Sequence, residues 1–175
     1  MSGIDIGMDG IDDIDIVEAD LGRSDHCEAV LSLVDQYARD PMGNQAPLSS
    51  SVRDALIPGL KAHPTTLIFL AFESGKAADS ALGIAVCFRG FSTFAAKPLI
   101  NLHDLFVKET ARGHDLGRAL LDAVAQKARA IGACKVTLEV QSENLRARGV
   151  YAAAGFEQAV YQPEAGGALF LTKLV

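Results

Sequence analysis

The sequence predicts a single domain of the α/β (α+β) class, in which helices cover one central sheet. Its 175 residues, 49% of them hydrophobic, are enough for one sizeable core. Seven segments have strand-like apolar patterns and four have helical spacing, and the two kinds are mixed along the chain. Segments 66–72 and 81–88 are apolar at nearly every position, which is typical of strands in the middle of a covered sheet.

The amino-terminal half opens with ten residues rich in glycine and aspartate, which we expect to form a flexible leader before a domain spanning 11–175. Isoleucines alternate with acidic residues over 11–19, as in a half-buried strand. Helical spacing begins at Ser24 and ends before Pro41, and it recurs over 50–61. The turn-like residues 73–81 join the two central strands as a hairpin.

The carboxyl-terminal half continues to mix strands and helices. We expect strands over 99–107 and 134–140, helices over 114–131 and 143–155, and a closing hairpin of strands over 156–162 and 167–174. The second of these helices should end at Gly155.

Composition excludes several classes of partner. The net charge of −6 and a pI near 5.1 disfavour nucleic acid, whose binding depends on Lys and Arg contacts to phosphate. There is no uninterrupted apolar run of membrane-spanning length and no export signal, so we expect a cytoplasmic protein that does not bind membranes. The three cysteines are odd in number and widely spaced, which indicates free thiols and no metal site.

The segment RGHDLGRAL, residues 112–120, places glycines directly before a long amphipathic helix. A helix start carries partial positive charge and N–H groups without partners, so it can hold an anion. Gly113 and Gly117, after Arg112, carry no Cβ that would keep a phosphate from the backbone. A phosphorylated ligand is the expected occupant.

A second block, NLRARGVYAAAGF at 144–156, follows one strand later. Together the two blocks resemble the GCN5-related N-acetyltransferase (GNAT) family, and the resemblance extends over about residues 14–174. It implies a mixed, mostly antiparallel, twisted sheet of about seven strands with about four helices, splayed between the fourth and fifth strands. The segment LHDLFV at 102–107 resembles the diamine branch, the spermidine/spermine-type enzymes, with His103 where that branch has Glu.

The resemblance implies acetyl-CoA as co-substrate, without a metal. It assigns the pyrophosphate to the loop and the pantetheine arm to the edge of the preceding strand. The residues so implied are Arg112, Gly113, His114, Leu116, Gly117 and Arg118 in the loop, and Leu105, Phe106 and Val107 in the strand. Asp115 stands where the family usually has its central glycine. If Asp115 caps the helix and faces away, the anion site is kept.

Direct attack of an amine on a thioester moves two protons. The resemblance points to Tyr151 as donor to the leaving thiolate, although packing against the sheet would also explain this tyrosine. Asn144 either caps its helix or bonds the pantetheine amides. For the base we expect His103, because histidine commonly titrates near neutral pH, with Glu139 as the competing carboxylate. Regular alternation places His103 and its neighbour Asp104 on opposite faces of the strand.

The expected reaction is therefore acetyl transfer from acetyl-CoA to a primary amine of a small molecule, by direct attack in a ternary complex. Two alternatives stay open. One is acetylation of a protein amino terminus or lysine, and the other is a domain that senses acyl-CoA without turnover. Family members commonly pair, so we also expect a homodimer.

Overall fold

One mixed sheet forms the centre of the molecule in the computed structural model, which describes residues 14–74, 80–159, 164 and 171–173. Within these residues the sheet has five strands in chain order. They are β1 Ile14–Glu18, β2 Thr66–Glu73, β3 Ala81–Ser92, β4 Lys97–Val107 and β5 Val136–Leu138. The first four strands pair antiparallel, and β5 pairs parallel to β4.

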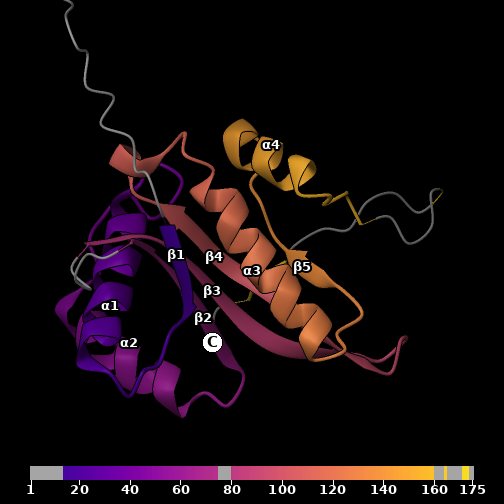
Figure 1. Ribbon diagram of the computed structural model, residues 1–175, viewed down its shortest axis with the longest axis horizontal. Coiled ribbons are helices and arrows are strands. Elements are labelled where there is room, and N and C mark those ends of the chain that lie inside the picture. The colour runs from indigo at the N-terminus through magenta and orange to yellow at the C-terminus, as the bar shows by residue number, and fades with distance from the viewer. Residues whose placement is uncertain (1–13, 75–79, 160–163, 165–170, 174–175) are drawn as a thin grey trace, which may run out of the picture.

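Four α-helices cover the two faces of this sheet (Figure 1). They are α1 Ser24–Arg39, α2 Ser50–Ala62, α3 Leu116–Ala130 and α4 Leu145–Ala153. The helices α1 and α2 lie on one side of the sheet and α3 on the other, while α4 lies beyond the start of α3 (Figure 1). A short 3₁₀ helix, Glu109–Ala111, joins β4 to the loop before α3.

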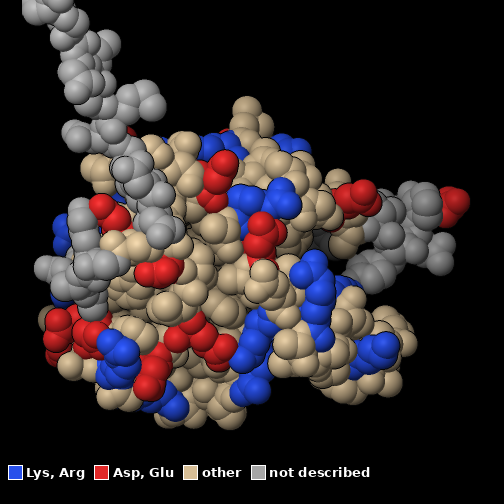
Figure 2. All heavy atoms as spheres, viewed as in Figure 1, with Lys and Arg blue, Asp and Glu red and all other residues tan. Residues whose placement is uncertain are grey.

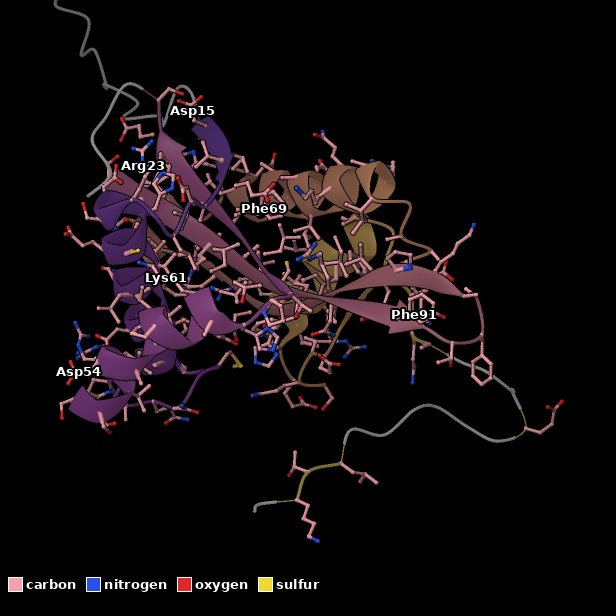
Figure 3. All side chains as sticks on the ribbon, turned by 90° about the horizontal axis from the view of Figure 1, so that it is seen from below. Asp15, Arg23, Asp54, Lys61, Phe69 and Phe91 are labelled. Atoms are coloured by element: carbon pink, nitrogen blue, oxygen red, sulfur yellow. The ribbon has the colours of Figure 1, made fainter. Side chains whose placement is uncertain are left out.

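Side chains alternate between the two faces of the sheet along each strand, so an apolar core layer forms on each face. In β2, Phe69 lies in the middle of the sheet (Figure 3) and packs in the layer under α3, whereas the next residue, Leu70, packs in the layer under α1. The α3 layer includes Leu120, and the α1 layer includes Leu33, both fully buried. Because β2 and β3 serve both layers, their sequences are apolar almost throughout.

The sheet splits between β4 and β5. The two strands pair through Ile100–Val136, Asn101–Thr137 and Leu102–Leu138, and pairing then stops although β4 continues to Val107. The carboxyl-terminal part of β4 therefore has β3 on one side and no strand of the described residues on the other. This split is the one expected between the fourth and fifth strands.

Most expected elements are confirmed, with corrections at their ends. The strand expected over 134–140 is reduced to three residues, and the helix expected from 114 begins at Leu116. Seven strands are not confirmed, because residues 156–159 form no strand and most of the expected closing hairpin lies outside the described residues. The expected leader and most of the turn over 73–81 also lie outside them.

The surface shows mixed charge and one projecting hairpin. Acidic and basic side chains are interspersed over the face seen in Figure 2. The β3–β4 hairpin extends beyond the helices and carries Phe91 near its end (Figure 3). Among the helices of the described residues, none has the length and apolarity needed to cross a membrane.

Candidate active site

The split in the sheet opens into a cavity of about 1160 Å³. Its walls come from α1 and the loop after it, from the end of β4, from the loop before α3, from the segment after β5 and from α4. Segments more than 100 residues apart, such as Tyr37 of α1 and Tyr151 of α4, therefore line one space. The cavity reaches from the start of α3 to the α1 face of the sheet.

The start of α3 presents unpaired backbone donors to this cavity. The first N–H to find a helical acceptor is that of Ala119, which donates to the Asp115 carbonyl at 2.9 Å. The N–H groups of Leu116, Gly117 and Arg118 have no acceptor among the described residues, and all three residues line the cavity. A helix start of this kind binds an anion, so the geometry supports the expected phosphate loop.

Gly117 leaves room that the protein does not itself fill. A Cβ added there would meet only the Val150 side chain, at 3.6 Å, which is ordinary contact. Gly113 has φ +89°, and a Cβ there would meet nothing within 4 Å. Packing within the chain therefore does not require a glycine at 117, whereas a ligand lying against the backbone would.

Asp115 takes the left-handed conformation of a glycine without making the expected cap. Its φ of 55° and ψ of 14° lie in the left-handed region, which aspartate tolerates better than most residues. It is the N-cap of α3, but its side chain makes no capping hydrogen bond, and it lines the cavity. Asp115 thus adopts a backbone conformation that glycine favours, while its carboxylate stays beside the candidate anion site.

The Arg112 side chain makes its hydrogen bonds to other groups of the protein. Its Nε donates to the Val107 carbonyl at 3.0 Å and its NH2 group to Asp40 Oδ2 at 2.7 Å, while the guanidinium lies 5.9 Å from the centre of the Phe106 ring. Its own N–H donates to the Glu109 carbonyl. The side chain therefore joins β4 to the loop after α1 and leaves phosphate contact to the backbone of the following residues.

The other polar residues expected in the loop and in α4 make structural bonds. Arg118 bonds Asp122 and the Ala153 carbonyl, the latter at 2.6 Å, which ties the start of α3 to the end of α4. Asn144 caps α4 by accepting from the Ala147 N–H at 3.1 Å, as one of the two expectations for it stated. The His114 side chain is exposed and is not part of the cavity wall, so only its N–H can serve the anion site.

The edge of β4 beyond the split offers backbone groups on the cavity side. Lys108 donates to Leu82 of β3, and backbone groups alternate in direction along a strand. The groups of Phe106 therefore face β3, while those of Leu105 and Val107 face the split. The Val107 carbonyl confirms this direction, because it accepts from Arg112 and not from β3.

A β-bulge corrects the expected placement of His103 and Asp104. Asp104 is paired with Val86, but Leu102 is paired with the next residue, Cys87, so His103 is an extra residue in β4. The His103 ring contacts the Phe88 ring at 5.6 Å, edge to face, and Phe88 and Val86 both belong to the α1 layer. Both polar side chains therefore lie on the same face.

Glu139 and Tyr151 line the cavity from the far side of the split. Glu139 accepts from the Asn101 carboxamide at 3.3 Å, so its carboxylate already has a partner. Burial, followed by the Tyr37 hydroxyl and the Asp104 charge, raises the pKa of Tyr151 to about 12. The Tyr151 hydroxyl is therefore protonated at neutral pH.

Sequence reasoning did not single out Tyr37 or Asp40. Tyr37 lies on the apolar face of α1, where its spacing indicates a core residue, yet it lines the cavity, and burial followed by the charges of Asp104 and Asp40 raises its pKa. Asp40 directly follows α1 in what the sequence presents as a loop. Only the fold shows that both residues face the loop before α3.

The split sheet, the unpaired donors at the α3 start and the cavity between them define a fold of the acyltransferase class. Residues 30–156, well over half of the chain, match the model of the acetyltransferase (GNAT) family. The chain belongs to this family, and the expected membership is confirmed.

Individual relatives agree with this assignment. YhfO of Bacillus subtilis (strain 168), described as an uncharacterized N-acetyltransferase, is 32% identical over 93 residues, or 53% of this chain. The match spans 60% of that protein's length. A crystal structure of a probable acetyltransferase is 25% identical with a TM-score of 0.73, over 91% of this chain and 99% of its own. AAC(6')-Iy, solved with a bisubstrate analog of CoA, has the same fold at 19% identity, with a TM-score of 0.70 over 93% of this chain and 99% of its own.

Proposed function

We propose that this protein transfers an acetyl group from acetyl-CoA to a primary amine of a small molecule. The observation that carries the proposal is the set of unpaired N–H groups at Leu116, Gly117 and Arg118, which open into the cavity that also holds Tyr151. An anion-binding helix start and a proton donor share one space large enough for a cofactor-sized ligand. The similar fold of AAC(6')-Iy, which was solved with a CoA analog, supports the same choice of co-substrate.

The donor side of the reaction would use backbone groups. The α3 start holds the pyrophosphate, and the free edge of β4 at Leu105 and Val107 pairs with the pantetheine arm as an added strand would. When bound, acetyl-CoA supplies a thioester whose C–S bond breaks as the new amide bond forms. The nearby β4 N–H groups stabilise the charge that develops on the carbonyl oxygen.

The acceptor side would use side chains. His103 takes the proton that the ammonium must lose before its nitrogen can attack, and Tyr151 gives a proton to the departing thiolate. Glu139 is the second candidate for the base, although its bond to Asn101 makes it the less available of the two. Proton gain and loss are balanced in this scheme, and no metal is needed.

A small amine is the proposed acceptor. The likeness of residues 102–107 to the diamine branch supports a diamine or a similar alkylamine as substrate. A cytoplasmic homodimer is the proposed form of the protein.

Gly117→Glu tests the coenzyme site. The glutamate would place bulk and negative charge beside the unpaired N–H groups, so we expect the dissociation constant for coenzyme A, measured by calorimetry, to rise at least tenfold, or about 1.4 kcal/mol. Gly59→Glu, in exposed α2, is the matched control and should bind normally. Unchanged affinity in a folded Gly117→Glu variant would remove the proposed site.

Turnover is then measured as release of free coenzyme A thiol with a panel of amines. Release with small amines and not with peptides supports the proposal. Release with peptides alone would assign the protein to the acetylation of other proteins. Tight coenzyme binding without release in any mixture would indicate an acyl-CoA sensor.

A further inference from the structure

The free edge of β4 beyond the split is already closed at one backbone group. Leu105 and Val107 each direct an N–H and a carbonyl toward the split, because both groups of a residue point to the same side of a strand. Arg112 Nε donates to the Val107 carbonyl at 3.0 Å. From the part of the chain that the structure describes, no hydrogen bond reaches the Leu105 N–H, the Leu105 carbonyl or the Val107 N–H. For a ligand that pairs with this edge, the edge therefore ends at the Val107 N–H.

Arg112 is fixed in this position by further contacts. Its NH2 group donates to Asp40 Oδ2 at 2.7 Å, and its guanidinium lies 5.9 Å from the centre of the Phe106 ring. Its own N–H donates to the Glu109 carbonyl at 3.2 Å. The Asp40 side chain is only 11% exposed and the Arg112 side chain 25%, so water screens this ion pair weakly. A charged donor bonds a carbonyl more strongly than an amide does, so a ligand amide does not displace Arg112 from Val107.

The Arg112 side chain occupies the junction between the strand edge and the anion loop. Arg112 directly precedes Gly113, and both residues line the same cavity as Leu105 and Val107. A ligand with its phosphate at the start of α3 must therefore pass Arg112 to reach the edge of β4.

The bond to Val107 distinguishes between two ways of pairing with this edge. An extended arm with amide groups pairs in steps of two residues, because only every second residue of β4 faces the split. One register uses the groups of Leu105 and the Val107 N–H, whereas a register one step nearer the loop also needs the Val107 carbonyl. The two registers differ by ~6.8 Å along the strand, which is two residues at ~3.4 Å each. A reacting group displaced by that distance is out of reach of the residues that act on it.

We propose that Arg112, held by Asp40, sets the register in which the arm of the coenzyme pairs with β4. This inference rests on the proposed function, in which the pantetheine arm lies along this edge. Because Arg112 occupies the Val107 carbonyl, the arm is left with the groups of Leu105 and the Val107 N–H. The register fixes how far the thioester extends past Leu105 into the cavity. Arg112 and Asp40 are therefore positioning residues, which bind neither the pyrophosphate nor the thioester.

The first test separates positioning from binding. Arg112→Met frees the Val107 carbonyl, and the double variant Arg112→Met with Asp40→Asn also removes the carboxylate that would be left without its partner. In both variants turnover, measured by thiol release, should fall at least tenfold. The dissociation constant for coenzyme A should stay within about threefold, because the α3 start still holds the pyrophosphate. The double variant should lose no more turnover than Arg112→Met alone, since Asp40 acts through Arg112.

Arg53→Met is the matched control. It also takes an arginine from an aspartate, Asp35, but neither residue lines the cavity, so turnover should be kept. Wild-type turnover in both Arg112 variants would overturn the proposal. A loss of coenzyme affinity as large as the loss of turnover would also overturn it, because Arg112 would then be a binding residue.

Carbonyl carbon resonances in NMR give a readout without turnover. In the wild type, coenzyme A should move the Leu105 carbonyl resonance and leave that of Val107 in place, because Arg112 already occupies the Val107 oxygen. In Arg112→Met, coenzyme A should move the Val107 resonance as well. ADP, which has the pyrophosphate without the arm, should move neither resonance in either protein.

These outcomes distinguish the inference from the proposed function. If the wild-type protein acetylates no amine but the resonances respond as stated, the proposed function fails and the role of Arg112 stands. If the Val107 resonance moves in the wild type, or stays in place in Arg112→Met, Arg112 does not set the register. If coenzyme A binds and moves neither resonance, the arm does not lie along β4, and the inference is wrong whatever the enzyme assay shows.

Discussion

Tyr151 could serve packing or proton donation, and only proton donation requires its hydroxyl oxygen. Its ring contacts Phe156 edge to face at 5.9 Å, which packing alone would explain, whereas its hydroxyl lies in the cavity wall beside Tyr37 and Asp104. Burial and these neighbours raise the pKa of Tyr151 to about 12. The hydroxyl thus stays protonated over the whole range in which an amine substrate can react.

Tyr151→Phe removes that oxygen and keeps the ring. We expect turnover to fall about 100-fold, as for a lost general acid, with coenzyme affinity and the free energy of unfolding nearly unchanged. Thiol release and calorimetry on the same preparation measure both quantities. A variant with wild-type turnover would show that the tyrosine serves packing alone.

At the scale of elements, one ion pair holds together the parts that surround the cavity. Asp40, directly after α1, accepts from Arg112 and from the Met42 N–H, while the Met42 carbonyl accepts from Gln141 after β5. Burial alone would raise the pKa of the Asp40 carboxyl, but the Met42 N–H and the Arg112 guanidinium together hold it below its ordinary value.

Asp40→Asn should lower the free energy of unfolding by about 1–2 kcal/mol at neutral pH, because a charged hydrogen bond in a half-buried site is lost. A lowered pKa contributes stability above the unfolded value of ~3.9, and that contribution disappears as the pH falls through the folded value. The difference from wild type should therefore close in acid. Urea denaturation at several pH values measures it, and a difference that persists in acid would contradict this reading of the pair.

The sequence predicted the elements whose patterns are long and regular. The amphipathic α3 and the apolar β2 and β3 were found because their burial repeats over many residues. The length of β5 was misjudged, because pairing with β4 stops where the sheet splits and no periodicity in the sequence records that. The end of α4 was predicted correctly, since the helix ends at Ala153 and Gly155, with φ +86°, follows its C-cap.

The candidate site could likewise be predicted only where its residues form a local pattern in the sequence. Glycines before a helix predict the candidate anion loop, because the property belongs to the backbone at those positions. The bulge at His103 was missed, since a two-residue alternation is assumed in any strand. Tyr37 and Asp40 reach the cavity through the packing of α1, which no local pattern in the sequence contains.

The whole molecule is two apolar layers built on one sheet. Leu120 fixes α3 to one face and Leu33 fixes α1 to the other, and both are fully buried. Since β2 and β3 contribute side chains to both layers, neither layer can be lost while the other stays intact. We therefore expect the described domain to unfold as one unit.

Leu120→Ala and Leu33→Ala should each lower the free energy of unfolding by about 2–5 kcal/mol, the usual cost of a cavity left by a buried leucine. Each variant should still unfold in one transition seen alike by fluorescence and circular dichroism. Two separate transitions in either variant would show that the two layers are independent.

The extra residue in β4 also bears on how the chain tolerates length changes. Ile100 and Leu102 face α3 before the bulge, and Leu105 and Val107 face α3 after it, so the apolar residues are spaced for a regular strand that is one residue shorter. A chain lacking one residue here would keep the regular spacing of the side chains that face α3. It would lose the ring contact between His103 and Phe88 and the presentation of two consecutive polar side chains to the α1 face, so the additional residue changes that face and not the pairing of the strand.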